Sequence, residues 1–186
     1  EGEEEAAWVQ TTALAPWVGR WGAAHGVYDG KIWMGGGYQN DLWYSADGVD
    51  WHLATENAPW FPLVDPVMIS FNGKLWVIGG QPPGKAGDGN VWSSENGVDW
   101  QEVTHEASWA NRHGHSVVVH GGELWLMGGS YMFDVWHSPN GSSWTSATLD
   151  APLGGSCIAA ASFNGKLWAL TTDYTSNSLW SSADGA

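Results

Sequence analysis

KLWVIGGQPPGKAGDGNVWSSENGVDW, residues 74–100, decides how this sequence folds, because three other segments of the chain repeat it. They are KIWMGGGYQNDLWYSADGVDW (31–51), ELWLMGGSYMFDVWHSPNGSSW (123–144) and KLWALTTDYTSNSLWSSADGA (166–186). The aligned tryptophans Trp33, Trp76, Trp125 and Trp168 are 43, 49 and 43 residues apart. Repeats of this length are typical of propeller blades, each of which needs a neighbour to bury its faces.

Each repeat predicts four short antiparallel strands. The first is apolar, as in HSVVVH (115–120), and the second is a continuous apolar run such as LWVIGG (75–80). The third carries a tryptophan, as in NVWSS (90–94), and the fourth starts near DWHLAT (50–55). Asp-Gly, Asn-Gly or Gly-Gly pairs separate the first two strands, and such pairs favour two-residue hairpins because both residues need positive φ. The fold class predicted is therefore all-β, a propeller with four blades per chain.

The two ends of the sequence match each other. AAWVQTTALAPW (6–17) aligns with VDWHLATENAPW (49–60), and the last repeat contains no fourth strand of its own. We therefore expect the segment of Trp8 to pair with the strand of Trp180 and to complete the last blade, which removes exposed sheet edges. The ring then closes either as a four-bladed monomer or as an eight-bladed homodimer, and the sequence leaves both open.

The predicted domain organisation follows from this alignment. Residues 1–5 form an acidic tail, and residues 6–186 form one propeller domain. The expected blades cover about 17–60, 61–109, 110–153, and 154–186 together with 6–16.

Double glycines end three of the second strands, at Gly35-Gly36, Gly79-Gly80 and Gly128-Gly129, and Gly114-His115 adds a GH pair. With the spaced aromatics, these motifs resemble the kelch family of β-propellers. The fourth repeat departs from the pattern with Thr171-Thr172, and kelch rings usually have six or seven blades. SADGVDW (45–51) also resembles the Asp-box turn of sialidases, one residue short, which implies a structural staple.

The charge balance excludes several partners. The chain has 186 residues, with 6 Lys plus Arg against 20 Asp plus Glu, and a formal net charge of -14. Such a surface repels nucleic-acid phosphates and anionic membranes, and no apolar run is long enough to span a bilayer. A single cysteine, Cys157, permits no internal disulfide. The location stays open, with a secreted or periplasmic one favoured.

Tryptophan and histidine are the residue types that could indicate a more specific function. Fifteen of the 16 tryptophans fall in repeat register, and only Trp21 does not, so most are predicted to fill the blade interfaces. His113 and His115 alternate along one strand as a metal pair would, but the matching positions of the other repeats are His25, Val67 and Ala159. We therefore expect no metal, no cofactor and no catalytic residue.

The loops that follow the second and fourth strands lie on one face of a four-stranded meander, and they are the longer and more variable ones. Variable loops on a rigid scaffold are where binding usually occurs. The predicted ligand-binding residues are Arg20, Trp21, Tyr38, Trp60, Trp109, Arg112, His113, Tyr131, Phe133 and Tyr174. The predicted function is a non-catalytic binding or scaffold module for an unknown small molecule, glycan or protein. The alternative is a sugar-processing enzyme of the kelch-like type, a mutarotase or an oxidase.

Overall fold

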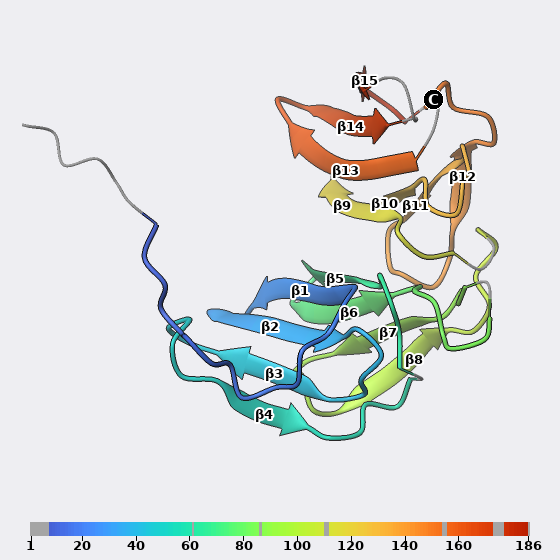
Figure 1. Ribbon diagram of the computed structural model, residues 1–186. Coiled ribbons are helices and arrows are strands. Elements are labelled where there is room, and N and C mark those ends of the chain that lie inside the picture. Colours follow the sequence, from blue (N-terminus) through green and yellow to red (C-terminus); the bar gives the residue numbers. More distant parts are fainter. Residues whose placement is uncertain are drawn as a thin grey trace, which may run out of the picture.

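A computed structural model describes residues 8–60, 62–85, 87–109, 112–153, 156–172 and 177–185 of the chain, with the side chains of 156–158 left aside. Four antiparallel sheets follow one another as the blades of a β-propeller (Figure 1), which confirms the predicted fold class. No helix in the described ranges is long and apolar enough to cross a membrane.

The blades have the strand order of a simple meander. Blade 1 consists of β1 (Ala23–Tyr28), β2 (Lys31–Gly36), β3 (Leu42–Ser45) and β4 (His52–Thr55). Blade 2 consists of β5 (Val67–Phe71), β6 (Lys74–Ile78), β7 (Val91–Ser94) and β8 (Trp100–Thr104). Blade 3 consists of β9 (Ser116–His120), β10 (Glu123–Met127), β11 (Val135–Ser138) and β12 (Thr145–Thr148). Blade 4 consists of β13 (Ser156–Phe163), β14 (Lys166–Thr172) and β15 (Asn177–Ser182). Residues of β1, β5, β9 and β13 together line a central cavity.

The first hairpin of each blade has the turn that its sequence predicts. Asn72 and Gly73 have φ values of 47° and 69°, and β5 pairs with β6 so that Phe71 faces Lys74. The corresponding turns at 29–30, 121–122 and 164–165 also have positive φ at both residues. These turns match the right-handed twist of the flanking strands.

The turn between the third and fourth strands is braced by its own side chains. In blade 2 the amide of Gly97 donates to Ser94 Oγ at 2.8 Å, and the amides of Val98 and Asp99 both donate to Asn96 Oδ1 at 2.8 Å. The same network recurs in blade 1 around Ser45 and Asp47, and in blade 3 around Ser138 and Asn140. The turn is therefore a rigid structural element, as its resemblance to an Asp-box implied.

The second-strand tryptophans join the blades. Trp33 of blade 1 lies against Gly97 of blade 2, Trp76 lies against Gly141 of blade 3, and Trp125 lies against Gly185 of blade 4. All three indoles are buried, and each Nε1 donates to the carbonyl of the last residue of its own first strand, at 2.8 to 3.1 Å. These contacts place the main hydrophobic clusters between consecutive blades.

The N-terminal segment does not complete the last blade of its own chain, contrary to what the four-bladed monomer, one of the two predicted closures, requires. Within the described residues the sheet of blade 4 has three strands, residues 8–22 form no strand, and the Trp8 side chain is fully exposed. Instead Thr11 Oγ1 donates to Gly48 O at 3.4 Å and Thr12 Oγ1 to Val49 O at 3.3 Å, so the segment runs along blade 1.

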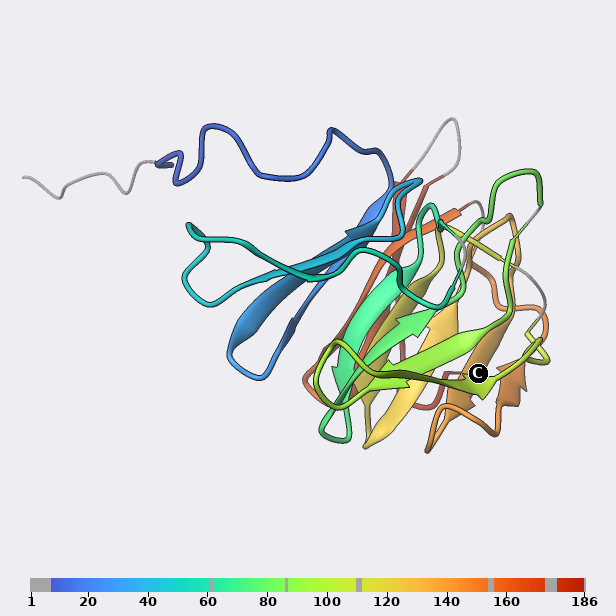
Figure 2. The same cartoon turned by 90° about the horizontal axis from the view of Figure 1, so that it is seen from below.

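The physical reason is the spacing of the blades. The inner strands β1 and β5, β5 and β9, and β9 and β13 pack together, but no comparable contact joins β13 to β1. Blades 1 and 4 are therefore the two ends of an arc (Figures 1 and 2), and a segment anchored on blade 1 does not lie beside β15.

The tryptophan-glycine contact predicts a measurable asymmetry between two glycines. A Cβ at Gly141 would lie 2.3 Å from the Trp76 ring, whereas a Cβ at Gly73 meets nothing within 4 Å, and both glycines have similar positive φ values (76° and 69°). Both substitutions by Ala incur the left-handed backbone penalty of about 1–2 kcal/mol. Gly141→Ala adds an overpacking cost of about 1–3 kcal/mol. Urea unfolding measures the difference, and equal losses for the two variants would show that the contact is not tight.

Candidate functional site

The long connections of the propeller gather at one end of the sheets and the short hairpins at the other (Figure 2). We call the first end the loop face. Within the described residues it comprises the segment before β1 and the connections β2–β3, β4–β5, β6–β7, β8–β9, β10–β11 and β12–β13. The sequence placed the predicted binding residues on these connections, and the structure shows which of them are available to a ligand.

Arg112 is a buried structural residue. Its Nη1 donates to Asp134 Oδ1 at 2.7 Å and its Nη2 to Asp134 Oδ2 at 2.9 Å, while Nη1 also reaches Gly128 O at 3.0 Å and Nε reaches Trp109 O at 2.9 Å. Trp136 Nε1 donates to the same carboxylate at 2.7 Å. The arginine therefore ties the β8–β9 connection to the start of β11, and its side chain is fully buried. Contact of Arg112 with a ligand stays a prediction.

Arg20 repeats this arrangement in blade 1. It forms a two-bond ion pair with Asp41 at 2.6 and 2.9 Å, Trp43 Nε1 donates to the same carboxylate, and the arginine side chain is almost completely buried. Arg20 thus also has a structural partner, and its contact with a ligand stays a prediction. At the corresponding positions blade 2 has Leu63 and Asn90, so the same place in the fold accepts either an ion pair or an apolar residue beside an amide.

The two carboxylates of these ion pairs stay ionised. Burial alone would raise the pKa of Asp134, but the hydrogen bonds from Arg112 and Trp136 outweigh it and hold the pKa below its usual value. The same balance lowers the pKa of Asp41, where burial opposes the hydrogen bonds from Arg20 and Trp43.

The linker tryptophans are also part of the core. Trp60 lies edge-on to Trp100 with ring centroids 4.6 Å apart, and Trp109 lies edge-on to Trp144 at 5.8 Å. Both Trp60 and Trp109 are buried, and their role as binding residues stays a prediction. Their repeat register was the signal for this burial, because a side chain that recurs in every linker fills the same space in every blade.

Four aromatic side chains of the predicted set extend into solvent. Trp21 is 65% exposed, Tyr38 is 54% exposed, and the two rings stack with centroids 6.3 Å apart and an interplanar angle of 23°. Tyr131 is 66% exposed on the β10–β11 connection, and Phe133 beside it is exposed as well. Tyr174 lies outside the described residues.

His113 is half-buried and belongs to a second inter-loop contact, since its Nδ1 lies 3.2 Å from Ser130 Oγ. This contact occupies the same place in blade 3 as the stack of Trp21 on Tyr38 in blade 1. In blade 2 the corresponding residues, Val64 and Gln81, are joined by two backbone hydrogen bonds of 3.0 and 2.8 Å. Sequence reasoning missed Ser130 and Gln81. The sequence could have indicated both residues, because each comes five residues after the second-strand tryptophan of its blade, as Tyr38 does.

The backbone holds the exposed rings in an unusual conformation. Tyr38, Ser130 and Tyr131 have φ values of 69°, 49° and 60°, in the left-handed region that L-residues seldom adopt. Conformations of this kind persist where the surroundings fix them, and they cluster at binding sites. Next to Tyr38, the amide of Gly37 donates to Leu63 O of the following linker at 2.7 Å, which supplies such a constraint.

His115, the second member of the considered metal pair, is buried beside Trp109, with ring centroids 6.1 Å apart. Burial, and secondarily the charge of Arg112, lowers the pKa of His115 to about 3, so the ring is neutral. The described part of the chain contains no group of three or more His, Cys, Asp or Glu side chains that could hold a metal ion.

Comparison with known proteins identifies the fold and nothing finer. No protein-family model matches the chain, and no curated protein matches it. Among solved structures the chain is similar to the one titled "Structure of YjhT", with a TM-score of 0.70 and 16% sequence identity over 87% of this chain. The match spans 60% of the length of that protein. The likeness supports the propeller fold, and membership of the kelch family stays a prediction.

The ion pair of Arg112 predicts a specific pattern of rescue. Arg112→Leu leaves the buried carboxylate of Asp134 without its partner, which should lower the free energy of unfolding by about 3–5 kcal/mol. Adding Asp134→Asn recreates the leucine and asparagine that blade 2 has at these positions. The double variant should therefore regain most of the free energy of unfolding that Arg112→Leu loses. Denaturant unfolding of the wild type and the three variants measures this, and a double variant as unstable as Arg112→Leu alone would contradict the structural role.

The same carboxylates predict loss of stability in acid. Because the folded-state pKa values of Asp41 and Asp134 are lowered, their contribution is present above the unfolded-state value of about 3.9 and is lost as the pH falls through the folded-state values. Unfolding measured between about pH 7 and pH 2 should show this decline. The Arg112→Leu/Asp134→Asn variant should show a shallower one, and an unchanged slope would contradict the assignment.

Proposed function

We propose that this protein is a non-catalytic binding module that holds its ligand on the loop face, against Trp21, Tyr38 and Tyr131. The observation that carries the proposal is the exposed stack of Trp21 on Tyr38 above a rigid base. Aromatic rings cost free energy when they face water, and exposed aromatics on a fixed scaffold are typical of binding hot spots. The buried ion pair of Arg20 with Asp41 fixes the segment that carries Trp21.

The charges on the loop face favour a neutral or cationic ligand. Arg20 and Arg112 are the only arginines of the chain, and both are occupied by buried ion pairs. The net charge of -14 opposes the approach of an anion. Flat aromatic rings with little cationic charge around them suit the apolar face of a sugar ring, a small apolar molecule or an apolar side chain of a protein.

A sugar-processing enzyme is the alternative that the propeller fold also allows, since one fold hosts many functions. General acid catalysis at this face would need a carboxyl group that is protonated near neutral pH and within reach of a ligand. Asp41 and Asp134 do not meet that need, because their pKa values are lowered and their oxygens are engaged by arginine and tryptophan. Asp88 of the β6–β7 connection differs, because burial raises its pKa while its Oδ1 accepts a hydrogen bond from the amide of Asn90 at 2.8 Å, so the enzyme stays the alternative.

The test is a screen of neutral oligosaccharides and small apolar metabolites, followed by calorimetric titration of any ligand found. Trp21→Ala and Tyr131→Ala should each weaken binding by about 1 kcal/mol or more, roughly fivefold, without altering the melting temperature appreciably. Asn164→Ala, in a hairpin at the opposite end of the sheets, should leave the affinity unchanged. Weaker binding by Asn164→Ala together with wild-type affinity in both aromatic variants would place the site elsewhere.

A further inference from the structure

Every blade interface inside the chain is built from the same parts. The last residue of the first strand contacts the next blade: Tyr28 Oη donates to Gly73 O at 2.7 Å and to Glu95 O at 2.8 Å, and His120 Nδ1 lies 2.9 Å from Ser162 Oγ. In blade 2 the corresponding Phe71 is buried. The second-strand tryptophan of the same blade then covers the turn glycine of the next one.

The sheet of blade 4 has one face toward blade 3 and one face away from it, and we call the second its outer face. This outer face presents one half of the interface without the other half. Phe163 corresponds to Tyr28 and Phe71, yet it is 61% exposed. Leu170 corresponds to Ile78 and is also exposed, although Ile78 is completely buried against blade 3. The end of the arc is therefore an apolar surface whose counterparts elsewhere in the chain are covered by a following blade.

The outer face of blade 1, which points away from blade 2, presents the complementary half. Ile32 is 41% exposed, whereas the corresponding Leu75 and Leu124 are completely buried against the preceding blade. A Cβ at Gly48 would meet only Ile32, its own blade-mate, while the corresponding Gly97 and Gly141 each carry a tryptophan ring from the preceding blade. Blade 1 is thus shaped to receive a second-strand tryptophan such as Trp168.

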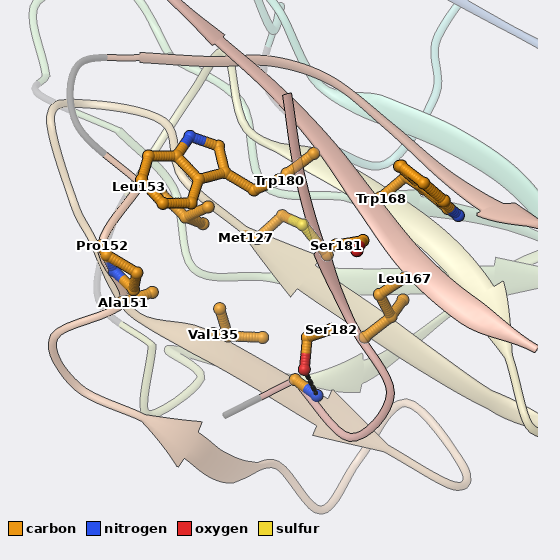
Figure 3. Close-up of a pocket in the computed structure, with 12 residues that line it drawn as sticks. Met127, Val135, Ala151, Pro152, Leu153, Leu167, Trp168, Trp180, Ser181 and Ser182 are labelled. Carbon is orange, nitrogen blue, oxygen red and sulfur yellow. Dashed lines mark hydrogen bonds between the residues drawn. The ribbon is translucent and has the colours of Figure 1, made fainter. Parts of the chain in front are cut away.

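A hollow between blades 3 and 4 lies where blades 1, 2 and 3 have their fourth-strand tryptophan (Figure 3). It holds about 490 Å³ of unfilled space, part of it open to solvent, and Leu153, Trp180 and Gly185 are among its lining residues. In blade 3 the equivalent surroundings enclose Trp144, which packs on Trp109 and donates from Nε1 to Gly141 O at 3.0 Å. In blades 1 and 2 the fourth-strand tryptophans lie against Trp17 and Trp60 in the same way.

We propose that a second copy of this chain completes the arc, with its blade 1 docked on the outer face of blade 4 and its N-terminal segment added to β15 as the fourth strand. Trp8 of that copy fills the hollow, because Trp8 precedes Trp17 by the nine residues that separate Trp51 from Trp60. Phe163 and Leu170 of the first copy then cover Ile32 of the second.

The strand register of this joint follows from the other blades. The third-strand tryptophans pair with fourth-strand residues as follows: Trp43 with Leu53, Trp92 with Glu102, and Trp136 with Ser146. Each of these partners comes two residues after the tryptophan of its own fourth strand. The register shifts next to each pair. The same offset places Trp180 opposite Gln10 of the second copy. A head-to-tail joint of this kind gives a ring if the rotation closes and a longer array if it does not.

The net charge of -14 per chain opposes this association through long-range repulsion, and salt screens that repulsion. At about 0.15 M ionic strength the screening length is about 8 Å, so the apolar joint is best tested at that ionic strength or above.

The experiment measures the mass of the full 186-residue chain by light scattering. The wild type should show at least twice the 20.1 kDa of one chain. Phe163→Asp and Ile32→Asp should each reduce the mass to that of a single chain, because each removes one half of every joint. Val98→Asp, at an exposed position of blade 2, should retain the assembly, because blade 2 packs against a blade of its own chain on either side.

Mixing the variants gives the sharper result. An equimolar mixture of Phe163→Asp and Ile32→Asp chains still contains one intact joint, so it should form a particle of two chains although neither variant does so alone. A wild type at 20.1 kDa, or an assembly that survives Phe163→Asp, would overturn the proposal.

The N-terminal strand has its own pair of variants. Trp8→Ala should weaken the association about tenfold or more, as expected for an anchor residue that fills a pocket. Val9→Asp should leave it unchanged, since Val9 corresponds to His52, Gln101 and Thr145, which are all exposed in their blades. Equal effects of the two substitutions would show that the segment is not seated as a fourth strand.

Discussion

The contact between an indole and a glycine of the neighbouring blade is the interaction on which this structure depends. The rings of Trp33, Trp76 and Trp125 each lie so close to a turn glycine that any side chain there would collide with them. The glycine also has the left-handed conformation that closes the turn, so a single residue type meets a steric and a backbone requirement together. Tryptophan and glycine recur along the sequence because this one contact recurs between successive blades.

A second level of organisation separates the scaffold from the surface that is free to vary. Ion pairs in blades 1 and 3, and a leucine with an asparagine in blade 2, occupy the same place and connect each linker to the third strand. Immediately after that anchor comes a position that contacts the neighbouring loop through stacking, backbone pairing or a histidine-serine contact. Because the anchor is buried and fixed, the next residue can change its chemistry without disturbing the fold.

This separation supports the proposal that the loop face binds a ligand. The rings of Trp21 and Tyr38 face water while the residues directly beneath them are buried or held in ion pairs. The rotamers and backbone of such a surface are largely fixed before a ligand arrives, which lowers the entropic cost of association. The ends of the arc differ in kind, because they expose the same apolar contacts that hold the blades together internally.

The sequence by itself determined the blades, their hairpins and turns, and the burial of the strand tryptophans, because those features rest on contacts that recur with the repeat and leave a period in the chain. Only the tertiary structure decided that Arg112, Trp60 and Trp109 are buried. A loop residue of either kind can face solvent or fill the core, and the neighbouring blade determines which. The pairing of the N-terminal segment was likewise beyond the sequence. The alignment of Trp8 with Trp51 predicts a fourth strand. Which sheet such a strand can join depends on the angle between blades, and that angle is set by many packing contacts rather than by any one segment.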